Sequence, residues 1–408
     1  MNLRRSGASA VAVLLMAACQ AVSGLTGLDA NESPFTTELF GIETAQKVRS
    51  TAFAAYEWEL QKTMQVTYVD SDAQIIDLTR MAPGEDWITT NLSSVAVDGP
   101  VYAPRENARM IGFSWVAGTR QVAFIDLKGL LREIWGDERG YWELNDLSDL
   151  TKAPLPAAGS DLSGTQLKTP VSSKQLMYLD DSGHVIEAYI VESQGWKSGD
   201  LTARIAAPDA EQGSAMSAYQ WEEPLSKAVV YLDAQGHVHQ LKTVHHMLGW
   251  THFDPTQDTH APVAASDSSL SGYASSSEHR ELIVYLDEGG HIHELSGDLD
   301  GKWSYSGDLT EAAHAPAALR SSPLRGYDWP AAGSKQVAYF DEDHQLQQLY
   351  QVHGKGWQRL TLTGDAKPPR AASDSDLSAF AWTAGKSAHL VYVDEDNALR
   401  EVRITENK

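Results

Sequence analysis

The sequence predicts an all-β fold, a seven-bladed β-propeller of four-stranded antiparallel blades that is closed by an N-terminal strand. Three observations lead to this prediction. A run of the form Val-x-Tyr-x-Asp recurs about every 54 residues, a tryptophan follows it at a nearly constant distance, and each repeat contains several short strand-like segments. A repeat of this length with several strands per unit is typical of β-propellers.

The repeat is clearest in the stretch VYLDEGGHIHEL, residues 284–295, and it occurs seven times. The aromatic residue of the run recurs every 53 to 56 residues, at Tyr68, Phe124, Tyr178, Tyr231, Tyr285, Tyr339 and Tyr392. A tryptophan follows six copies at Trp87, Trp142, Trp196, Trp250, Trp303 and Trp357. Another tryptophan precedes five copies at Trp58, Trp115, Trp221, Trp329 and Trp382. Eleven of the twelve tryptophans therefore occupy two repeat positions, and Trp135 is left outside the pattern.

Each repeat is interpreted as four strands. The first is aromatic-x-Trp, the second is the Val-x-Tyr-x-Asp run, the third is apolar-x-Glu-apolar, and the fourth carries the following tryptophan and leads into Asp-Leu-Thr and an Ala-Pro loop. The turn between the second and third strands needs a residue that tolerates positive φ, as tight hairpins do. Gly129, Gly183, Gly236, Gly290 and Asn397 occupy that position. Ala73 and His344 stand there in the other two copies, and we expect those turns to differ.

The seventh repeat lacks a strand of its own. Only six copies have the tryptophan strand, because the chain ends at Lys408. A closed ring must pair the open edge of its last blade, and the segment Pro34–Thr44 is the natural donor. We therefore predict one propeller over residues 34–408, with six full blades and a partial one as the alternative.

The N-terminus has the features of an export signal. Two arginines precede an apolar run that ends in small residues, which is typical of a secretory leader. Met16-Ala17-Ala18-Cys19 resembles the lipobox of bacterial lipoproteins, which implies a signal peptide over residues 1–18, lipidation of Cys19 and a tether over residues 19–33. Gln20 after the cysteine resembles lipoproteins sorted to an outer membrane. The alternative is an ordinary cleaved leader with an incidental cysteine. Cys19 is the only cysteine, so no intrachain disulfide can form.

The charge excludes one class of partner. The chain carries a formal charge of −23, and removal of residues 1–18 takes away two arginines and no acids, which gives −25. Nucleic-acid binding depends on basic contacts to phosphate, so this balance argues against it. It fits an exported domain at the surface of the cell envelope.

The repeat resembles the fucose-specific lectin family of β-propellers over essentially the whole mature chain. The resemblance implies sugar sites between adjacent blades, in which an Arg and a Glu hydrogen-bond the sugar and an aromatic ring stacks on it. The family glutamate is present as Glu133, Glu187, Glu294 and Glu401, and is replaced by Asp77, Gln240 and Gln348. The family arginine is replaced by Gln65, Gln121, Gln175, Ala228, Leu282, Gln336 and His389. Loss of the bidentate guanidinium argues against fucose itself, and the best remaining pairs are Gln121 with Glu133 and Gln175 with Glu187.

Each candidate also has a structural interpretation. The four glutamates could bond the neighbouring blade instead of a ligand, since buried polar groups are usually paired internally. Trp142, Trp196 and Trp303 are candidate sugar platforms, but aromatic residues repeated once per blade more often pack between blades. The repeated histidines His184, His237, His239, His291 and His293 are interpreted as structural, because zinc needs three or four converging ligands. A possible exception is blade four, where His245, His246 and His252 follow.

We therefore predict a lipid-anchored, lectin-like envelope protein that binds glycans in inter-blade pockets, with no cofactor and no metal. The alternative is a scaffold that presents its ring to another envelope protein and binds no sugar. The sequence has no G-x-S-x-G, H-E-x-x-H or P-loop motif. Near-equal repeats imply equivalent blades, which argues against the single asymmetric site of an enzyme, although a hydrolase with paired carboxylates would leave no local motif.

Overall fold

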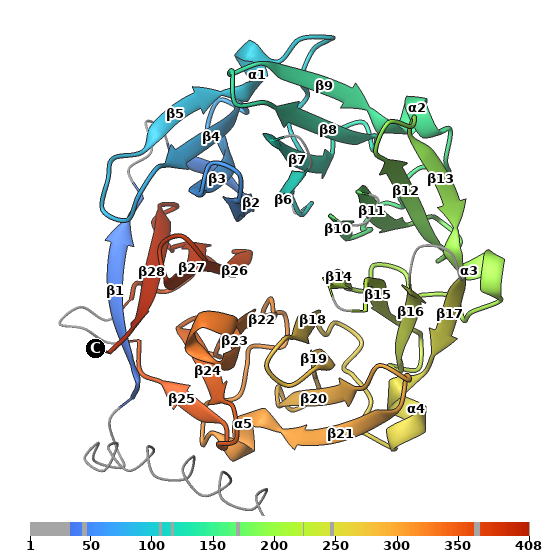
Figure 1. Cartoon of the computed structure of the whole chain (residues 1–408), viewed down its shortest axis with the longest axis vertical. Coiled ribbons are helices and arrows are strands. Elements are labelled where there is room, and N and C mark those ends of the chain that lie inside the picture. The colour runs from blue at the N-terminus through green and yellow to red at the C-terminus, as the bar shows by residue number, and fades with distance from the viewer. Residues whose placement is uncertain are drawn as a thin grey trace, which may run out of the picture.

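The predicted seven-bladed propeller is confirmed. The computed structural model describes residues 33–407 except 43–46, 106–107, 116–117, 169–171, 223, 245–248 and 363–367. Seven separate four-stranded antiparallel sheets stand around a central axis, with their first strands innermost (Figure 1). The predicted signal peptide, Cys19 and nearly all of the tether lie outside the described residues. Among the helices that are described, none has the length and hydropathy of a membrane span.

The strands follow the repeat in order. Blade 1 contains β2 (Val48–Trp58), β3 (Thr63–Asp70), β4 (Ile75–Arg80) and β5 (Ile88–Asn91). Blade 2 contains β6 (Ile111–Trp115), β7 (Thr119–Ile125), β8 (Leu131–Gly136) and β9 (Trp142–Asp146). Blade 3 contains β10 (Leu162–Leu167), β11 (Ser173–Leu179), β12 (Val185–Val191) and β13 (Lys197–Asp200). Blade 4 contains β14 (Met216–Trp221), β15 (Ser226–Leu232), β16 (Val238–Val244) and β17 (Trp250–Phe253).

The remaining blades complete the ring. Blade 5 contains β18 (Leu270–Ser275), β19 (Arg280–Leu286), β20 (Ile292–Gly297) and β21 (Trp303–Asp308). Blade 6 contains β22 (Arg325–Trp329), β23 (Ser334–Phe340), β24 (Leu346–Val352) and β25 (Gln358–Leu360), with the 3-10 turn η2 (Pro330–Ala332) between its first two strands. Blade 7 contains β26 (Leu377–Trp382), β27 (Ser387–Val393) and β28 (Leu399–Glu406), and its fourth strand is β1 (Phe35–Gly41).

The N-terminal strand closes the ring as predicted. β1 pairs antiparallel with β28 over its whole length, from Phe35 opposite Glu406 to Gly41 opposite Arg400, and lies along the outer edge of blade 7 (Figure 1). Phe35 also reaches blade 6, where its ring stacks on Trp329 at 5.3 Å between centroids. The strand therefore satisfies the open edge of the last blade and packs that blade against its neighbour.

The hydrophobic core lies in the boundaries between adjacent blades, which we call seams. The buried apolar residues form seven clusters, and each cluster joins two neighbouring blades. At the inner edge the blades approach closely. A Cβ atom at Gly326 would lie 2.3 Å from the ring of Tyr273 in the preceding blade, so only glycine fits there. The backbone N–H of Gly326 is bonded across the same seam to the hydroxyl of Ser271 at 3.0 Å.

The repeated aspartate and tyrosine organise each blade. The Asp after the second strand accepts two backbone N–H bonds across its turn in all seven copies, as Asp287 does from Gly289 and His291 at 2.9 Å each. In blades 3 to 7 the tyrosine hydroxyl donates to a proline carbonyl of the preceding loop, as Tyr285 does to Pro262 at 2.6 Å. One expectation was wrong, because Ala73 and His344 adopt φ of 62° and 57°, the same left-handed turn as the glycines.

Short helices follow the fourth strands of the first five blades, where the sequence predicted only Asp-Leu-Thr and a loop. They are α1 (Leu92–Val95), α2 (Leu147–Thr151), α3 (Leu201–Ile205), α4 (Pro255–Thr259) and α5 (Leu309–Ala312). The Asp of this motif is the N-cap, as Asp200 is for the N–H of Ala203 at 2.8 Å. In α3, Leu201 is buried and the hydroxyl of Thr202 accepts, at 2.9 Å, the N–H of Val185, which begins the third strand; Ser93 and Ser148 make the same bond in blades 1 and 2.

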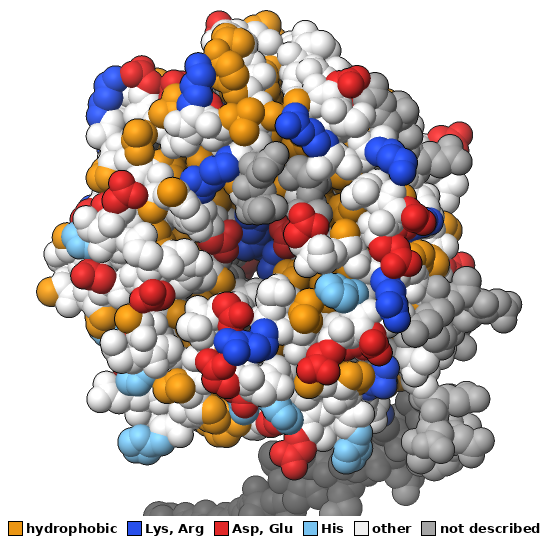
Figure 2. Space-filling model, turned by 180° about the vertical axis from the view of Figure 1, so that it is seen from behind, with side chains coloured by type: hydrophobic (Ala, Val, Ile, Leu, Met, Phe, Trp, Pro, Cys, Tyr) orange, Lys and Arg blue, Asp and Glu red, His pale blue; other side chains and the backbone are white. Residues whose placement is uncertain are grey.

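A tunnel runs along the axis of the ring. One face has a hollow at its centre, with basic and acidic side chains in and around it (Figure 2). Among the described residues, cavities open in the tunnel and in one seam.

Candidate functional site

The four predicted glutamates all lie in seams, and each is paired with a basic side chain of the next blade. Glu187 bonds Lys227 at 3.2 Å, Glu294 bonds Lys335 at 2.9 Å, and Glu133 bonds Lys174. Glu401 of blade 7 bonds Arg80 of blade 1 at 2.7 Å, which joins the two ends of the ring. The structural interpretation thus accounts for at least one oxygen of each of these glutamates.

Around this repeat position, a buried charge pair is present in six of the seven seams. Asp77 meets Arg120 at 3.1 Å between blades 1 and 2. Between blades 4 and 5 the signs are exchanged, since Lys242 of blade 4 bonds Glu281 of blade 5 at 3.0 Å. In the seam between blades 6 and 7, Gln348 instead donates to Tyr327 and Gln336 of its own blade. Removing one partner of a buried pair leaves an uncompensated charge. Between blades 4 and 5 the base comes from the first blade and the acid from the second, so the pair is kept with its two charges in reversed order.

In two of the seams, both repeated tryptophans lie against the basic group. The amino group of Lys174 lies 4.7 Å from the ring of Trp115 and 5.0 Å from that of Trp196. The guanidinium of Arg120 lies between Trp58 and Trp142 at 4.7 and 4.5 Å. Such cation–π contacts stabilise a desolvated cation. The other four cations each lie near one repeated tryptophan, as Arg80 does 4.0 Å from the ring of Trp87.

A cavity of about 370 Å³ opens in the seam between blades 2 and 3. Its polar lining includes the predicted pair Gln121 and Glu133, together with Lys174. Three indole rings also border it, from Trp115, Trp135 and Trp196. The volume is within the range of small-molecule sites, and the lining combines flat apolar surfaces with a few polar groups.

Gln121 has an unused acceptor beside this cavity. Its amide nitrogen donates to the Thr119 hydroxyl at 2.7 Å, while its buried Oε1 has no hydrogen-bond partner among the described residues. A buried polar atom without a partner costs free energy, so a hydroxyl donor from a ligand would satisfy it. The indole N–H of Trp115 is likewise buried without an acceptor in the described part of the chain.

Glu133 and Lys174 provide a fixed charge pair at the cavity wall. Glu133 accepts from Lys174 with one oxygen and from Asn145 with the other at 3.1 Å. Burial lowers the pKa of Lys174 from its ordinary value, and Glu133 acts in the opposite direction. Both oxygens of Glu133 accept bonds within the protein, and the carboxylate holds Lys174 and Asn145 in place at the cavity wall.

The other candidates are placed differently. Gln175 repeats the arrangement of Gln121 one blade further, with its nitrogen on Ser173 at 3.0 Å and its buried Oε1 without a partner among the described residues. Trp142 and Trp303 are 3% and 7% exposed, so these two rings pack inside their seams and offer no open face. Of the three candidate platforms, Trp196 is the one that borders the cavity.

Sequence reasoning missed eight of the eleven described residues that line this cavity, among them Trp115, Trp135, Asn145 and Lys174. Trp135 is the twelfth tryptophan, the one that no repeat position explains. It lies 5.6 Å from the ring of Tyr141, a residue that has no aromatic counterpart at its position in other repeats. The position of Trp135 itself is aromatic in two other repeats, as Tyr189 and Tyr350, so the available signal was the unmatched Tyr141 beside a tryptophan that stands outside the two repeated tryptophan positions.

The repeated histidines have structural partners in their own blades. His184, His237 and His291 contact the helix N-cap aspartates Asp200, Asp254 and Asp308 at 2.7 to 3.0 Å. His239 and His293 contact the turn aspartates Asp233 and Asp287 at 3.0 and 3.1 Å. Arg132 and Gln347 make the same bond to the turn aspartate from the same repeat position, so any donor serves there.

Metal ligation is not indicated by the described residues, among which no group of three His, Cys, Asp or Glu side chains is arranged to hold an ion. In blade 4, His239 contacts His252 at 2.9 Å. His245 and His246, which made this blade the exception in the sequence, lie outside the described residues.

The closing seam should weaken in acid. Burial raises the pKa of Glu401, but the hydrogen bond and charge of His389 and the charge of Arg80 outweigh it, so the pKa is lower than the ordinary 4.5. A carboxylate with a lowered folded-state pKa contributes stability above its unfolded-state pKa, and this contribution is lost as the pH falls through the folded value. We expect Glu401→Gln to flatten the loss of stability between about pH 5 and pH 3, measured as urea midpoints. Parallel pH curves for the two proteins would contradict this role.

Comparison with known proteins identifies the architecture. No protein-family model matches the sequence, and no curated protein matches it. The BP39L lectin of Burkholderia pseudomallei superposes with a TM-score of 0.64 and 15% identity, covering 88% of this chain and 96% of the lectin. AofleA of Arthrobotrys oligospora gives a TM-score of 0.54 at 14% identity, covering 81% and 91% of the two chains.

A third similar structure is the Aleuria aurantia lectin in complex with α-methyl-L-fucoside, with a TM-score of 0.52, 18% identity, and coverage of 78% of this chain and 96% of the lectin. That lectin is described as a fucose-specific, six-bladed β-propeller. The resemblance to fucose-specific lectin propellers that the sequence indicated is thus confirmed in structure, and at these identities what it establishes for this chain is the β-propeller fold.

Proposed function

We propose that this protein is a lectin-like binding protein, without enzymatic activity, that holds carbohydrate in the cavity between blades 2 and 3. The observation that carries the proposal is the lining of that cavity. It combines three indole rings with an unpaired amide oxygen and a fixed lysine–carboxylate pair. A sugar ring presents both an apolar face and hydroxyl groups, so it matches this combination.

The proposal includes attachment to the cell envelope. The lipobox-like sequence before Cys19 supports export and lipidation of that residue, and two or more acyl chains would give a durable membrane anchor. The tether over residues 19–33 would then separate the propeller from the membrane. This placement would present the cavity to glycans at the cell surface.

The ligand proposed here is a glycan whose recognition does not require the bidentate hydrogen bonds of an arginine side chain. Similar propellers are reported with fucosides. In blade 2 of this chain, Gln121 stands where the lectin family has its sugar-binding arginine, and the cation of this seam is Lys174 from the next blade. A lysine offers a compact point charge, whereas an arginine offers a planar bidentate fork. The recognised hydroxyl pattern should therefore differ.

A glycan array with the mature protein tests the proposal. We expect binding to a restricted set of neutral glycans, and we expect Gln121→Ala to weaken it. A blank array for the wild-type protein, repeated at high protein concentration, would overturn the proposal.

A second candidate function, an interaction scaffold that binds no sugar, is favoured by exposed apolar side chains on blades 1 and 2. Ile88, Val95, Val97 and Tyr141 are 42% to 56% exposed. Val97 pairs with Glu143 of β9, so this surface crosses the seam between the two blades. Recovery of a stoichiometric envelope protein by cross-linking, combined with a blank array, would support the scaffold instead.

A further inference from the structure

The central tunnel contains a second cavity that is unrelated to the seams. A space of about 390 Å³ lies at one mouth of the tunnel, and a smaller one of about 210 Å³ lies behind it. Arg109, Arg325 and Asp376 line both spaces, so these three residues form a partition across the tunnel. A molecule that enters the mouth meets this partition as its floor.

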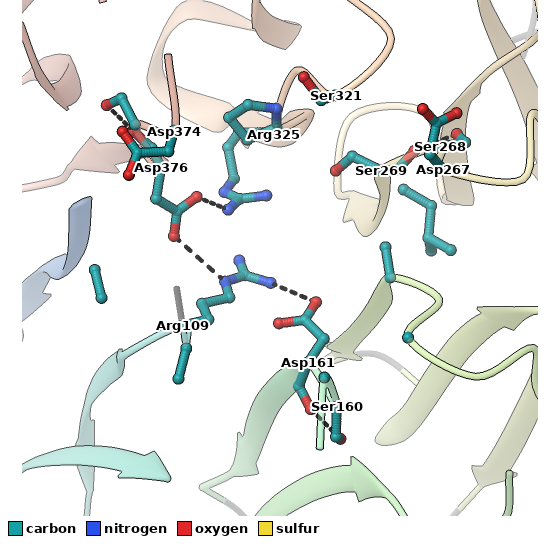
Figure 3. A pocket seen from close by; sticks show the side chains of 18 of the residues that line it. Arg109, Ser160, Asp161, Asp267, Ser268, Ser269, Ser321, Arg325, Asp374 and Asp376 are labelled. Carbon is teal, nitrogen blue, oxygen red and sulfur yellow. Dashed lines mark hydrogen bonds and ion pairs between the residues drawn. The ribbon is translucent and has the colours of Figure 1, made fainter. Parts of the chain in front are cut away.

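Arg109 is held at the centre of the floor without hydrogen bonds. Its guanidinium lies between Asp161 and Asp376, at 3.7 Å from one carboxylate and 3.9 Å from the other (Figure 3). Both distances exceed hydrogen-bond length, and no other described residue accepts a bond from Arg109. The donors of this group are therefore available at the floor of the cavity.

Arg325 differs from Arg109 in this respect. It donates to the carbonyls of Leu324 and Leu377 and to the carboxylate of Asp376. Burial, with the positive charge of Arg109 next in effect, lowers the pKa of Arg325 to about 10. Arg325 and Asp376 thus form the rigid part of the floor, beside which Arg109 keeps unused donors.

The charges of the mouth select the class of ligand. Four aspartates line it, Asp161, Asp267, Asp374 and Asp376, against two arginines. This excess of carboxylates repels an anion, whereas the guanidinium groups on the axis repel a cation. A neutral ligand with hydroxyl groups avoids both penalties.

The spacing of the floor suits hydroxyl oxygens. A hydroxyl oxygen that lies beside a guanidinium and a carboxylate 3.7 to 3.9 Å apart can be about 2.8 Å from both, so it can accept from the first and donate to the second. Two such gaps flank Arg109. Most of the remaining lining is formed by small residues, including Gly159, Ser160, Gly213, Ser268, Ser269 and Ser321, and none of the described residues that line the mouth is aromatic.

We propose that the tunnel mouth is a second ligand site, which takes a small neutral polyhydroxylated molecule, either a free polyol or the terminal sugar of a glycan. Arg109 donates to its hydroxyl oxygens, and Asp161 and Asp376 accept its hydroxyl protons. The site does not depend on the seam cavity. It differs from that cavity in having no tryptophan at the ligand.

The absence of tryptophan provides the test. Sorbitol, methyl α-D-glucopyranoside and methyl α-D-mannopyranoside are titrated into the full chain by calorimetry, with tryptophan fluorescence recorded in parallel. Glucuronate and glucosamine serve as charged probes. We expect at least one neutral compound to bind without a fluorescence change, and Arg109→Gln to weaken that binding at least tenfold while Gln121→Ala leaves it unaltered.

Several outcomes would overturn this site. The first is that no neutral compound binds without a change in tryptophan fluorescence. The second is that Arg109→Gln binds the neutral compound as tightly as the wild type does. The third is that glucuronate or glucosamine binds more tightly than the neutral compounds. If Arg109→Gln does not fold, Arg109→Lys keeps the charge between the two aspartates but loses the planar fork, and we expect the same weakening. Failure of the seam proposal would appear separately, as loss of the binding that changes tryptophan fluorescence.

Discussion

Lys174→Met is expected to lower the free energy of unfolding by about 3–5 kcal/mol, because it leaves a buried carboxylate without its cation. Glu133 is fully buried, and Lys174 is 2% exposed. The carboxylate would retain only the bond from Asn145. The measurement is urea denaturation followed by tryptophan fluorescence.

Replacing Glu133 as well as Lys174 tests whether the unpaired carboxylate is the cause of the lost stability. In the double variant Glu133→Leu/Lys174→Met, both charges are replaced by apolar side chains of similar size, so most of the lost stability should return. Lys152→Met is the matched control, since the Lys152–Asp149 pair is exposed at 73% and 68% and should contribute less than about 1 kcal/mol. A double variant no more stable than Lys174→Met would show that the pair is not the unit that stabilises this seam.

Trp135→Ala is expected to weaken glycan binding at least tenfold, about 1.4 kcal/mol, with little change in stability. Trp135 borders the cavity and is half-buried, and its ring is placed beside Tyr141. Loss of the ring removes an apolar surface on which a sugar face can stack. The measurement is calorimetric titration with the strongest glycan on the array.

Tyr189→Ala provides the control, because Tyr189 occupies the position of Trp135 in the next repeat and does not line this cavity. We expect that variant to bind as the wild type does. Equal weakening by both substitutions would indicate a general effect on the blades, and an unaltered affinity in Trp135→Ala would remove the blade 2–3 cavity as the carbohydrate site.

The repeat allowed most of the fold to be predicted. Strand order, the number of blades and the closing strand follow from spacing alone, because equivalent positions of equivalent blades carry equivalent residues. The errors were local. Ala73 and His344 share the glycine turn because the preceding aspartate bonds two backbone N–H groups across it, and this constraint outweighs the preference of the single residue. The helices of four or five residues are too short to show a helical period.

The candidate site could be predicted only in part. The pair Gln121 and Glu133 lies within one repeat, and the resemblance of the repeat to lectin propellers pointed to it. Lys174 lies 41 residues after Glu133 and in another blade. Its spacing in the sequence does not show that it reaches the seam with blade 2. Gln175 stands at the position of the family arginine, and the basic residue of this seam, Lys174, is one position earlier.

What the sequence determined by itself is the module and its number of copies, since hydrophobic alternation, turn residues and spacing are properties of neighbouring residues along the chain. The tertiary structure decided which seam has an opening, which tryptophan rings lie against cations, and which carboxylates lie beside Arg109 in the tunnel. Those features depend on the approach of side chains from different blades. Their positions are set by the closure of the ring, to which all seven repeats contribute and which no single repeat encodes.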